Sequence, residues 1–302
     1  MGRMAPRLGR YLMSGRQPGP DGIAVVDKEA GWTSHDVVAK ARGVLGTRKV
    51  GHSGTLDPDA TGVLVLGVGR ATRLLRFLTL LPKIYRCQIL LGTETSTLDA
   101  SGEVVAEHDM STVRLDQVED AAKGFVGDIS QVPPMVSAIK VEGRRLYEIA
   151  REGGEVERAA RPVTVYRFDI TGTDDPGVYE AVVECSAGTY VRSLAADLGT
   201  ALGGGAHLDG LRRLSVGPFS DAEATSVEKI DLLPMAEAFR GREGVLVDED
   251  VAGDVAHGKV MDLGRLGVAG NGPWPVHATD GSLIAVYEPH GERAKPAVVL
   301  VG

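Results

Sequence analysis

The sequence has few cysteines, few aromatic residues and no long apolar stretch. Only two of its 302 residues are cysteines, Cys87 and Cys185, and 5% are aromatic. Each cysteine lies in an apolar run typical of a strand, so we expect buried free thiols and a cytoplasmic protein rather than a disulfide framework. No run of 18 apolar residues occurs, so we expect no membrane-spanning helix.

Motifs for phosphate loops and metal ions are also missing. The sequence contains no Gly-x-x-x-x-Gly-Lys-Ser/Thr, and its seven histidines lack the spacing of paired metal ligands. Gly67-Val-Gly69 stands between an expected strand and an expected helix, but Thr72 replaces the third glycine of a dinucleotide fingerprint. We therefore expect no metal and no nucleotide cofactor.

Positive charge is in the minority overall but is concentrated near the N-terminus. The net charge is −8, which by itself argues against a polyanionic partner. Residues 1–86, however, hold 14 basic and 6 acidic side chains, whereas the other 216 residues hold 19 and 35. This asymmetry predicts a basic working surface on an acidic body, although a solvated basic tail would account for part of it.

Length and composition indicate two domains behind a short tail. The chain is 43% hydrophobic and contains 40 glycines, which is typical of a globular, turn-rich α/β or α+β protein. Residues 1–21 are rich in arginine, glycine and proline, so we expect a disordered basic tail. Residues 22–240 form the larger domain, and residues 241–302, with short apolar runs and no long helix, predict a small all-β domain.

Apolar patterning predicts the elements of the larger domain. Strand-like runs occur at 22–27, 62–69, 85–91, 163–171 and 179–186. Helical spacing of apolar residues occurs at 34–45, 70–81, 115–125, 146–151 and 190–202.

The most unusual segment is Gly51-His-Ser-Gly-Thr-Leu-Asp-Pro-Asp-Ala-Thr-Gly62. It places a histidine and two carboxylates among three glycines, directly before a predicted strand. Asp57 and Pro58 fix a turn that presents the carboxylate on a rigid loop. From residue types alone, Asp57 is a nucleophile, a general acid or base, or merely the side chain of a turn. A hydrolase that pairs Asp57 with His52 also stays open, although no second acid–base motif accompanies it.

This segment resembles the catalytic motif of the TruB-type pseudouridine synthases, and other segments resemble the same family in the same order. They cover about residues 22–220 and read Val25-Val-Asp-Lys28 with Gly31-Trp-Thr-Ser34, Lys83-Ile-Tyr85, Gln131-Val-Pro-Pro-Met-Val-Ser-Ala-Ile-Lys140 with Gly143-Arg-Arg-Leu-Tyr147, and Ser186-Ala-Gly-Thr-Tyr-Val-Arg192 with Leu211-Arg-Arg-Leu214. The resemblance implies an α+β fold with a mixed, antiparallel-rich sheet and an RNA-binding insertion at about 130–165. More weakly, residues 256–259, 280–281 and 283–287 resemble a PUA domain, a small β-barrel that contacts RNA.

The resemblance also implies a reaction, the isomerisation of uridine 55 to pseudouridine in the TΨC loop of tRNA. The C1′–N1 bond breaks, the uracil turns and C5 joins C1′, so no cofactor is needed. Asp57 would be the catalytic aspartate, and attack on the sugar, proton removal towards a glycal and attack on C6 of the ring all stay open. Arg192 would pair with Asp57 and keep it ionised, and Tyr85 would stack on the base and is a candidate acceptor of a sugar proton.

Substrate binding is implied by the same resemblance. Tyr190 and Leu211 would line the uridine pocket, and His52 would enter the RNA where the flipped nucleotide leaves the stack. Asp99 aligns with an acidic residue beside the active site. We expect a monomer that binds the T stem-loop of tRNA and also assists tRNA folding. A pure RNA-folding helper is the alternative of a different class, and it would not need Asp57.

Basic side chains would bind RNA phosphates without reading sequence. Each of them also fits an ordinary solvated side chain. The candidates in the first third are Lys28, Arg48, Lys49, Arg70, Arg73 and Arg76, and those around the insertion are Lys140, Arg144, Arg145, Arg151, Arg158 and Arg161.

Overall fold

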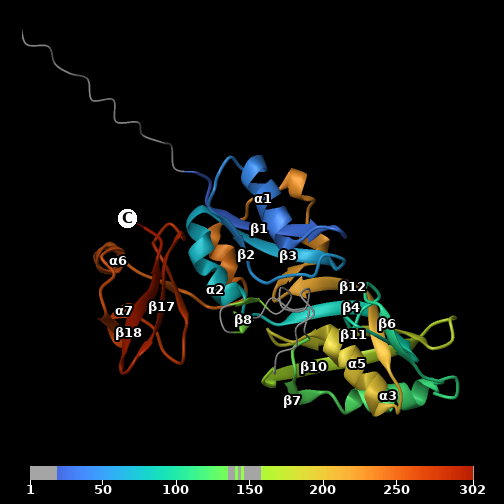
Figure 1. Cartoon of the computed structure of the whole chain (residues 1–302). Helices are drawn as coiled ribbons and strands as arrows, with labels where there is room; N and C mark the ends of the chain where they lie inside the picture. Colours follow the sequence, from blue (N-terminus) through green and yellow to red (C-terminus); the bar gives the residue numbers. More distant parts are fainter. Residues whose placement is uncertain (1–18, 135–139, 142–143, 146–157, 302) are drawn as a thin grey trace, which may run out of the picture.

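The structure is a computed structural model that describes residues 19–134, 140–141, 144–145 and 158–301 (Figure 1). In these residues the chain forms a nine-stranded sheet, a five-stranded sheet and two short two-stranded sheets. The predicted tail at 1–21 lies almost wholly outside the described residues, and the helix predicted at 146–151 lies wholly outside them. No helix in the described ranges is long and apolar enough to cross a membrane.

The nine-stranded sheet belongs to the larger domain. Its spatial order is β1, β3, β12, β4, β11, β10 and β7, with β2 beside β3 and β13 beside β12. The strands are β1 (Gly22–Lys28), β2 (Val50–His52), β3 (Thr61–Val68), β4 (Lys83–Leu91), β7 (Gly127–Gln131), β10 (Arg161–Gly172), β11 (Val178–Cys185), β12 (Ala206–Val216) and β13 (Phe219–Ser220). Only β3 and β12 pair in parallel among the described strands of this sheet, so the predicted mixed, antiparallel-rich sheet is confirmed.

Helices and short hairpins cover this sheet. They are α1 (Ser34–Val44), the 3₁₀ helix η1 (Gly69–Leu74), α2 (Leu75–Leu78), α3 (Leu115–Lys123) and α5 (Val191–Ala201), the paired strands β5 (Thr93–Thr95) with β6 (Val104–Glu107) and β8 (Lys140–Val141) with β9 (Arg144–Arg145), and the 3₁₀ turns η2 (Asp221–Glu223), η3 (Val227–Lys229) and η4 (Met235–Phe239).

The strands β1 and β3 are buried on both faces. Because side chains alternate along a strand, Val26 and Leu64 pack against α1 on one face, while Val25 and Val63 pack on the other face against η1, α2 and η4. Helix α1 begins where Thr33 accepts a hydrogen bond from the backbone of Asp36, whose side chain accepts one in return. This packing fixes the segments on both sides of the Gly51–Gly62 loop.

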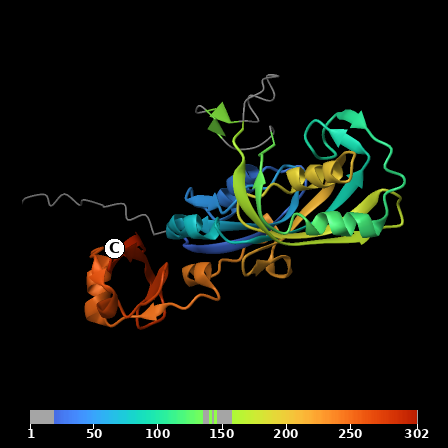
Figure 2. The ribbon, with the colours of Figure 1, turned by 90° about the horizontal axis from the view of Figure 1, so that it is seen from below.

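Helices α3 and α5 pack together on one face of the sheet, α3 against β10 and α5 against β12, as Figure 2 shows. Their apolar residues bury Cys87 and Cys185, which are free thiols as the sequence predicts. The amphipathic helix predicted at 70–81 is confirmed in part, since the segment is helical from Gly69 to Leu78, but as η1 followed by the single turn of α2. Its arginines bind groups far away in the sequence.

The five-stranded sheet lies in the C-terminal part of the chain. Its order is β14 (Val245–Leu246), β16 (Trp274–His277), β17 (Leu283–His290), β18 (Arg293–Val299) and β15 (Met261–Asp262). The prediction of an all-β domain is wrong, because α6 (Glu249–Ala256) and α7 (Leu263–Leu266) belong to the same unit. Asp248 caps α6 by accepting a hydrogen bond from the backbone of Val251.

Candidate functional site

The Gly51–Gly62 loop is held close to strand β12 at its C-terminal end. Gly62 has a φ of 100°, and a Cβ atom there would lie 2.2 Å from the carbonyl oxygen of Arg213. Only glycine permits both that conformation and that approach. The strand after the loop is therefore locked against β12.

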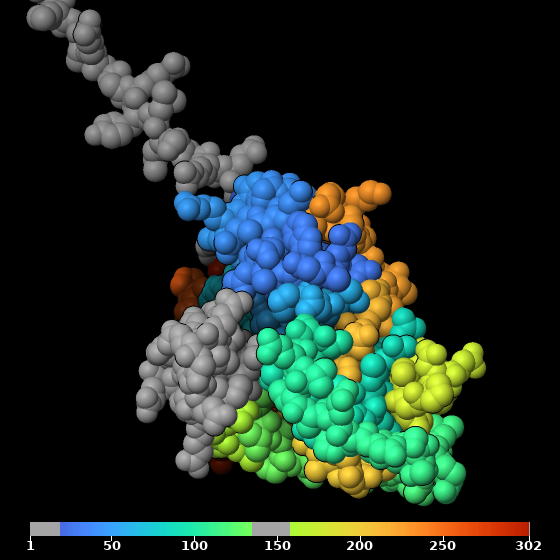
Figure 3. All heavy atoms as spheres, turned by 45° about the vertical axis from the view of Figure 1, so that its right-hand side comes forward, coloured from blue at the N-terminus to red at the C-terminus, as the bar shows by residue number. Residues whose placement is uncertain are grey.

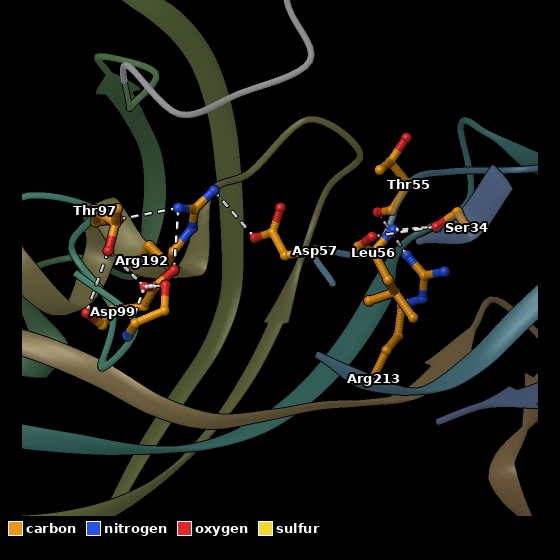
Figure 4. A network of polar contacts seen from close by, with 9 residues as sticks. Ser34, Thr55, Leu56, Asp57, Thr97, Asp99, Arg192 and Arg213 are labelled. Atoms are coloured by element: carbon orange, nitrogen blue, oxygen red, sulfur yellow. Dashed lines mark hydrogen bonds and ion pairs between the residues drawn. The ribbon is translucent and has the colours of Figure 1, made fainter. Parts of the chain in front are cut away.

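Contacts from three elements hold the residues on either side of Asp57. The hydroxyl of Ser34 in α1 donates to the carbonyl of Leu56 at 3.2 Å and accepts from its backbone N–H at 2.9 Å. The ammonium of Lys28 in β1 donates to the carbonyl of Pro58 at 2.8 Å. Arg213 in β12 donates to the carbonyls of Gly54 and Thr55. The carboxylate of Asp57 is thus presented from a rigid segment (Figure 4).

Asp57 forms an ion pair with Arg192, the second residue of α5. One guanidinium nitrogen of Arg192 lies 3.1 Å from the carboxylate of Asp57, and the arginine is 4% exposed. Burial raises the pKa of Asp57 above its ordinary value, the charge of Arg192 opposes this rise, and the charge of Asp99 adds to it. The pair that the family resemblance implied is present in the structure.

Asp99 holds the other side of Arg192. Its Oδ2 lies 3.1 Å from Nη1 of Arg192, which also donates to the carbonyl of Thr97 (Figure 4). The hydroxyls of Thr97 and Ser101 both donate to Oδ1 of Asp99 at 2.6 Å. Leu98 has a φ of 63°, a left-handed conformation that is rare for a residue with a side chain. The loop between β5 and β6 is therefore shaped to present Asp99 to Arg192.

A cavity of about 340 Å³ opens on one side of the ion pair. Asp57, Arg192, Tyr85, Tyr190 and Leu211 all line it, so the structure brings together five of the predicted site residues. Its volume lies within the range of about 300–1,000 Å³ that is usual for small-molecule sites. We call it the tyrosine cavity.

Both tyrosines of this cavity are held in place. Tyr85 is 9% exposed, and burial raises its pKa, an effect that the charge of Arg213 opposes. The backbone of Tyr190 exchanges two hydrogen bonds with the side chain of Gln131. Gln131 is 2% exposed and belongs to β7, so it fixes the start of α5 from across the sheet. No sequence pattern assigned this role to Gln131.

A second cavity, of about 510 Å³, lies on the other side of the ion pair. It shares Asp57, Arg192 and Leu211 with the tyrosine cavity, and its further charged lining residues are Asp59, Asp99 and Asp209. We call it the aspartate cavity. Figure 3 shows one face of the molecule, on which the N-terminal segments in blue adjoin later segments in green and orange.

His52 is close to the tyrosine cavity without lining it. It ends β2, and its Nδ1 accepts a hydrogen bond from the backbone of Gly54, which does line the cavity. Its ring meets that of His35 edge-on, with 5.4 Å between ring centres. Burial lowers the pKa of His52, and the charges of His35 and Arg213 lower it further.

The prediction that Lys28 contacts RNA phosphate is wrong. Lys28 is 1% exposed, and its ammonium donates to the carbonyls of Glu29, Trp32 and Pro58. All three of its N–H donors are therefore used inside the protein. The other candidates nearby, Arg48 and Lys49, are exposed and form no ion pair within the described residues.

The arginines of η1 and α2 bind the C-terminal part of the chain. Arg70 donates to the carbonyl of Leu300 at 2.6 Å and pairs with Asp21. Arg73 donates to the carbonyl of Val299, and Arg76 pairs with Glu288 at 3.0 Å. These arginines therefore connect the two sheets in this structure, a role that sequence reasoning did not predict.

Several predicted RNA contacts fall in or near the insertion. The side chains of Lys140, Arg144 and Arg145, and all of Arg151, lie outside the described residues. Arg158 donates to the carbonyl of Pro133, and Arg161 is exposed. Within the described residues, no group of three or more His, Cys, Asp or Glu side chains is placed to hold a metal ion.

Two charged residues of the tyrosine cavity, Lys83 and Arg213, were not among the predicted site residues. Both are buried and line the tyrosine cavity beside Tyr85. The sequence carries a signal for Lys83, because residues two apart on a strand share a face and Lys83 precedes Tyr85 by two. Arg213 stands in the Leu211–Leu214 motif, but its neighbour across the sheet could not be inferred from that motif.

Three family models match consecutive segments of the chain. The family model described as "TruB family pseudouridylate synthase (N terminal domain)" matches residues 42–191. Those described as "tRNA pseudouridylate synthase B C-terminal domain" and "tRNA Pseudouridine synthase II, C terminal" match residues 192–242 and 244–301.

Curated relatives match nearly the whole chain. The tRNA pseudouridine synthase B of Thermobifida fusca is 45% identical over 93% of this chain and 99% of its own length. That of Rhodococcus jostii is 47% identical over 92% of this chain and 93% of its own.

Solved structures share the fold. A chain of a Cbf5–Nop10–Gar1 complex matches with a TM-score of 0.70 and 26% identity, over 93% of this chain and 85% of that one. A chain of an H/ACA RNP bound to a substrate RNA containing 2′-deoxyuridine matches with a TM-score of 0.69 and 23% identity over the same shares.

Proposed function

Because the chain belongs to the TruB family of pseudouridylate synthases, we propose that it converts the uridine at position 55, in the TΨC loop of tRNA, to pseudouridine. Its curated relatives are tRNA pseudouridine synthases, so the reaction class is an isomerisation. The observation that carries the proposal is the ion pair of Asp57 and Arg192 at the wall of a cavity that two tyrosines also line.

Asp57 acts at the sugar in this proposal. An ionised carboxylate can attack C1′, or it can remove the proton from C2′ and start elimination to a glycal. Both routes need Asp57 charged, and Arg192 favours the charged form against the effect of burial. Asp99 positions Arg192 through its second guanidinium nitrogen.

The remaining cavity residues bind the flipped nucleotide. Tyr85 stacks on the uracil and is a candidate acceptor of a sugar proton, while Tyr190 and Leu211 form the walls around the base. His52, next to the cavity, fills the gap in the RNA that the flipped nucleotide leaves. Exposed arginines and lysines, with Arg48 and Lys49 nearest in sequence to the loop, contact phosphates.

The proposal also covers the division of the chain into domains, its location in the cell and its oligomeric state. Residues 22–240 form the catalytic domain, with an RNA-binding insertion at about 130–165, and residues 241–302 form a PUA-like domain. The five-stranded sheet begins at β14, which agrees with this division. The free buried cysteines favour a cytoplasmic location. The residues proposed to bind and convert the nucleotide all line a cavity of one chain, which favours a monomer.

Tritium release tests the proposal. In pseudouridine C5 bonds to the sugar and gives up its hydrogen, so a tRNA transcript with [5-³H]uridine loses label to water. We expect wild type to release the label at position 55, and Asp57→Asn to release less than about a thousandth as fast, since a missing nucleophile or base cannot be replaced. The matched control is Asp59→Asn, two residues further on, which should stay within a few-fold of wild type.

Release by Asp57→Asn at the wild-type rate, or no release by wild type, would contradict the proposal.

A binding measurement distinguishes an enzyme from a protein that only helps RNA to fold. Asp57→Asn should still bind tRNA, with an affinity that falls steeply as salt rises because phosphate contacts dominate. Unchanged tRNA refolding by this variant would show that the folding activity is independent of catalysis.

A further inference from the structure

Two buried cations line the tyrosine cavity without a carboxylate partner among the described residues. Lys83 is 5% exposed and donates to the carbonyls of Thr79 and Leu81 at 2.5 and 2.6 Å. Arg213 is 1% exposed and donates to the carbonyls of Val63, Thr55 and Gly54. Buried charges are costly and are normally paired with an opposite charge. The cavity therefore has an excess of positive charge.

The sheet places both cations next to Tyr85. Arg213 in β12 is the direct partner of Tyr85 in β4, and Lys83 lies two residues from Tyr85 on the same strand and hence the same face. Burial lowers the pKa of Lys83 to about 8, and the charge of Arg213 contributes to this shift. Two cations that repel each other are thus held next to the proposed binding surface of the uracil.

The proposed reaction passes through a negative charge at this place. When the C1′–N1 bond breaks heterolytically, its electron pair stays on N1 and spreads over O2 and O4 of the uracil. The sugar is left with a bond from Asp57 to C1′, or as a glycal whose C2′ proton is on Asp57. The pair of electrons then forms the C5–C1′ bond as the bond from Asp57 to C1′ breaks, or as Asp57 returns the proton to C2′ of the glycal. C5 afterwards loses its hydrogen to water and N1 gains a proton. Between the two steps, the free uracil is an anion.

We propose that Lys83 and Arg213 stabilise this uracil anion, so that the excess positive charge of the tyrosine cavity accelerates cleavage of the C1′–N1 bond. The inference rests on the proposed function and adds two residues to its mechanism. Preorganised charges act on a transition state without reorganising when the charge develops. Arg213 has a second task, since it also holds the carbonyls of Gly54 and Thr55.

Lys28 provides a matched control within the same protein. It is 1% exposed, it donates only to backbone carbonyls, and burial lowers its pKa to about 8 as well. It lines neither cavity. A substitution at Lys28 therefore measures the loss of a buried, loop-holding cation that does not face the uracil.

The test compares two leaving groups in single-turnover reactions of the full-length protein. The tRNA carries uridine or 5-fluorouridine at position 55, and liquid chromatography of the digested RNA, which separates isomeric nucleosides, follows consumption of that nucleoside. Fluorine withdraws electrons, so the fluorinated anion needs less help. We expect Lys83→Met to slow consumption of uridine about 100-fold, within the range for loss of one preorganised group, but that of 5-fluorouridine only a few-fold. Lys83→Arg should recover most of the rate.

Arg213→Gln should show the same dependence on the leaving group, superimposed on a loss that both substrates share. Lys28→Met should slow both substrates equally. Equal slowing of both substrates by Lys83→Met would overturn the inference, and if Lys83→Met fails to fold, the same criterion applied to Arg213→Gln decides. Failure of wild type to consume uridine 55 would instead overturn the proposed function.

Discussion

The two cavities beside Asp57 have opposite charge although they share the ion pair that separates them. The tyrosine cavity is lined by three cations, Lys83, Arg192 and Arg213, and one carboxylate. Among the described residues, the aspartate cavity is lined by four carboxylates and a single cation, Arg192. Arg192 is the only cation common to both linings.

This difference assigns the two sides different tasks. In the proposed reaction an anion is stabilised on the side of the tyrosines, whereas on the other side Asp99 holds Arg192 in place. Asp57 lies between them, and the charges of Arg192 and Asp99 shift its pKa in opposite directions. The position of its titration therefore reports on the balance between the cavities.

Removal of Arg192, the cation that both cavities share, should have the largest effect on the rate, because it removes the ion pair between the two cavities. Arg192→Gln removes the guanidinium that pairs with both Asp57 and Asp99, so the pKa of Asp57 should rise further. Because the ionised carboxylate is the active form, the acid limb of the pH profile should move to higher pH. Single-turnover tritium release should fall by about 100- to 1,000-fold. Arg192→Lys, which keeps the charge, should shift the limb less, and an unmoved limb in Arg192→Gln would contradict the assignment.

Lys28 is a buried cation outside both cavities, so it shows what burial alone does to a cation in this protein. Its pKa is about 8 in the folded protein against an ordinary 10.5, so between these pH values the unfolded chain binds more protons. Unfolding free energy should therefore rise with pH from about 8 to 10.5 in wild type relative to Lys28→Met. The relative gain is at most about 3 kcal/mol, and less where solvent reaches the turn.

Urea unfolding of both proteins at several pH values measures this gain. The difference between them isolates Lys28 from the cysteines and tyrosines that titrate in the same range. A constant difference across the range would show that the lysine is not desolvated.

Local signals predicted the elements of the catalytic domain well where packing agreed with them. Helix α1 has its capping residues Thr33 and Asp36 and one apolar face, and β3 is a continuous apolar run. The segment at 70–81 is helical as predicted only from Gly69 to Leu78. Its Arg70 and Arg73 bind carbonyls more than 200 residues away, which local patterning could not predict. No local window contains those partners.

The C-terminal helix α6 was missed although its signal is local. Asp248 stands at the N-cap, and Glu249 and Asp250 follow in the first turn, which suits the positive end of a helix. Short apolar runs and frequent glycines around the segment outweighed that signal. A capping test applied residue by residue would have found the helix.

The site residues also differ in how far the sequence alone could identify them. Asp57 could be singled out from its own loop, but its distance to Arg192 depends on how α5 meets that loop, which only the family resemblance implied. Lys28 was misjudged because a lysine after a strand usually reaches solvent, whereas here three carbonyls of the adjoining turns surround it. Lys83 and Arg213 were missed because their burial depends on the pairing of β4 with β12.

A substitution at Asp99 changes the aspartate cavity without removing a residue that lines the tyrosine cavity. Asp99→Asn removes one support of Arg192, which keeps its contacts to Asp57 and the carbonyl of Thr97, so the rate should fall only about 10-fold. Because the charge of Asp99 raises the pKa of Asp57, the acid limb should move to lower pH, opposite to Arg192→Gln. Asp209→Asn, in the same cavity, should stay within two-fold of wild type. A shift to higher pH in Asp99→Asn would mean that Arg192 had left Asp57.

The smallest effect should come from the exposed basic residues outside both cavities. Arg48 and Lys49 are exposed, unlike Lys28, so they are free to reach phosphate. Arg48→Gln combined with Lys49→Gln should weaken tRNA binding several-fold at low salt, and should lower the slope of log affinity against log salt by about 0.7–0.9 for each phosphate that is no longer neutralised. Single-turnover rates at saturating protein should not change, because neither residue faces the uracil. An unchanged salt slope would mean that RNA phosphates approach the catalytic loop from another side.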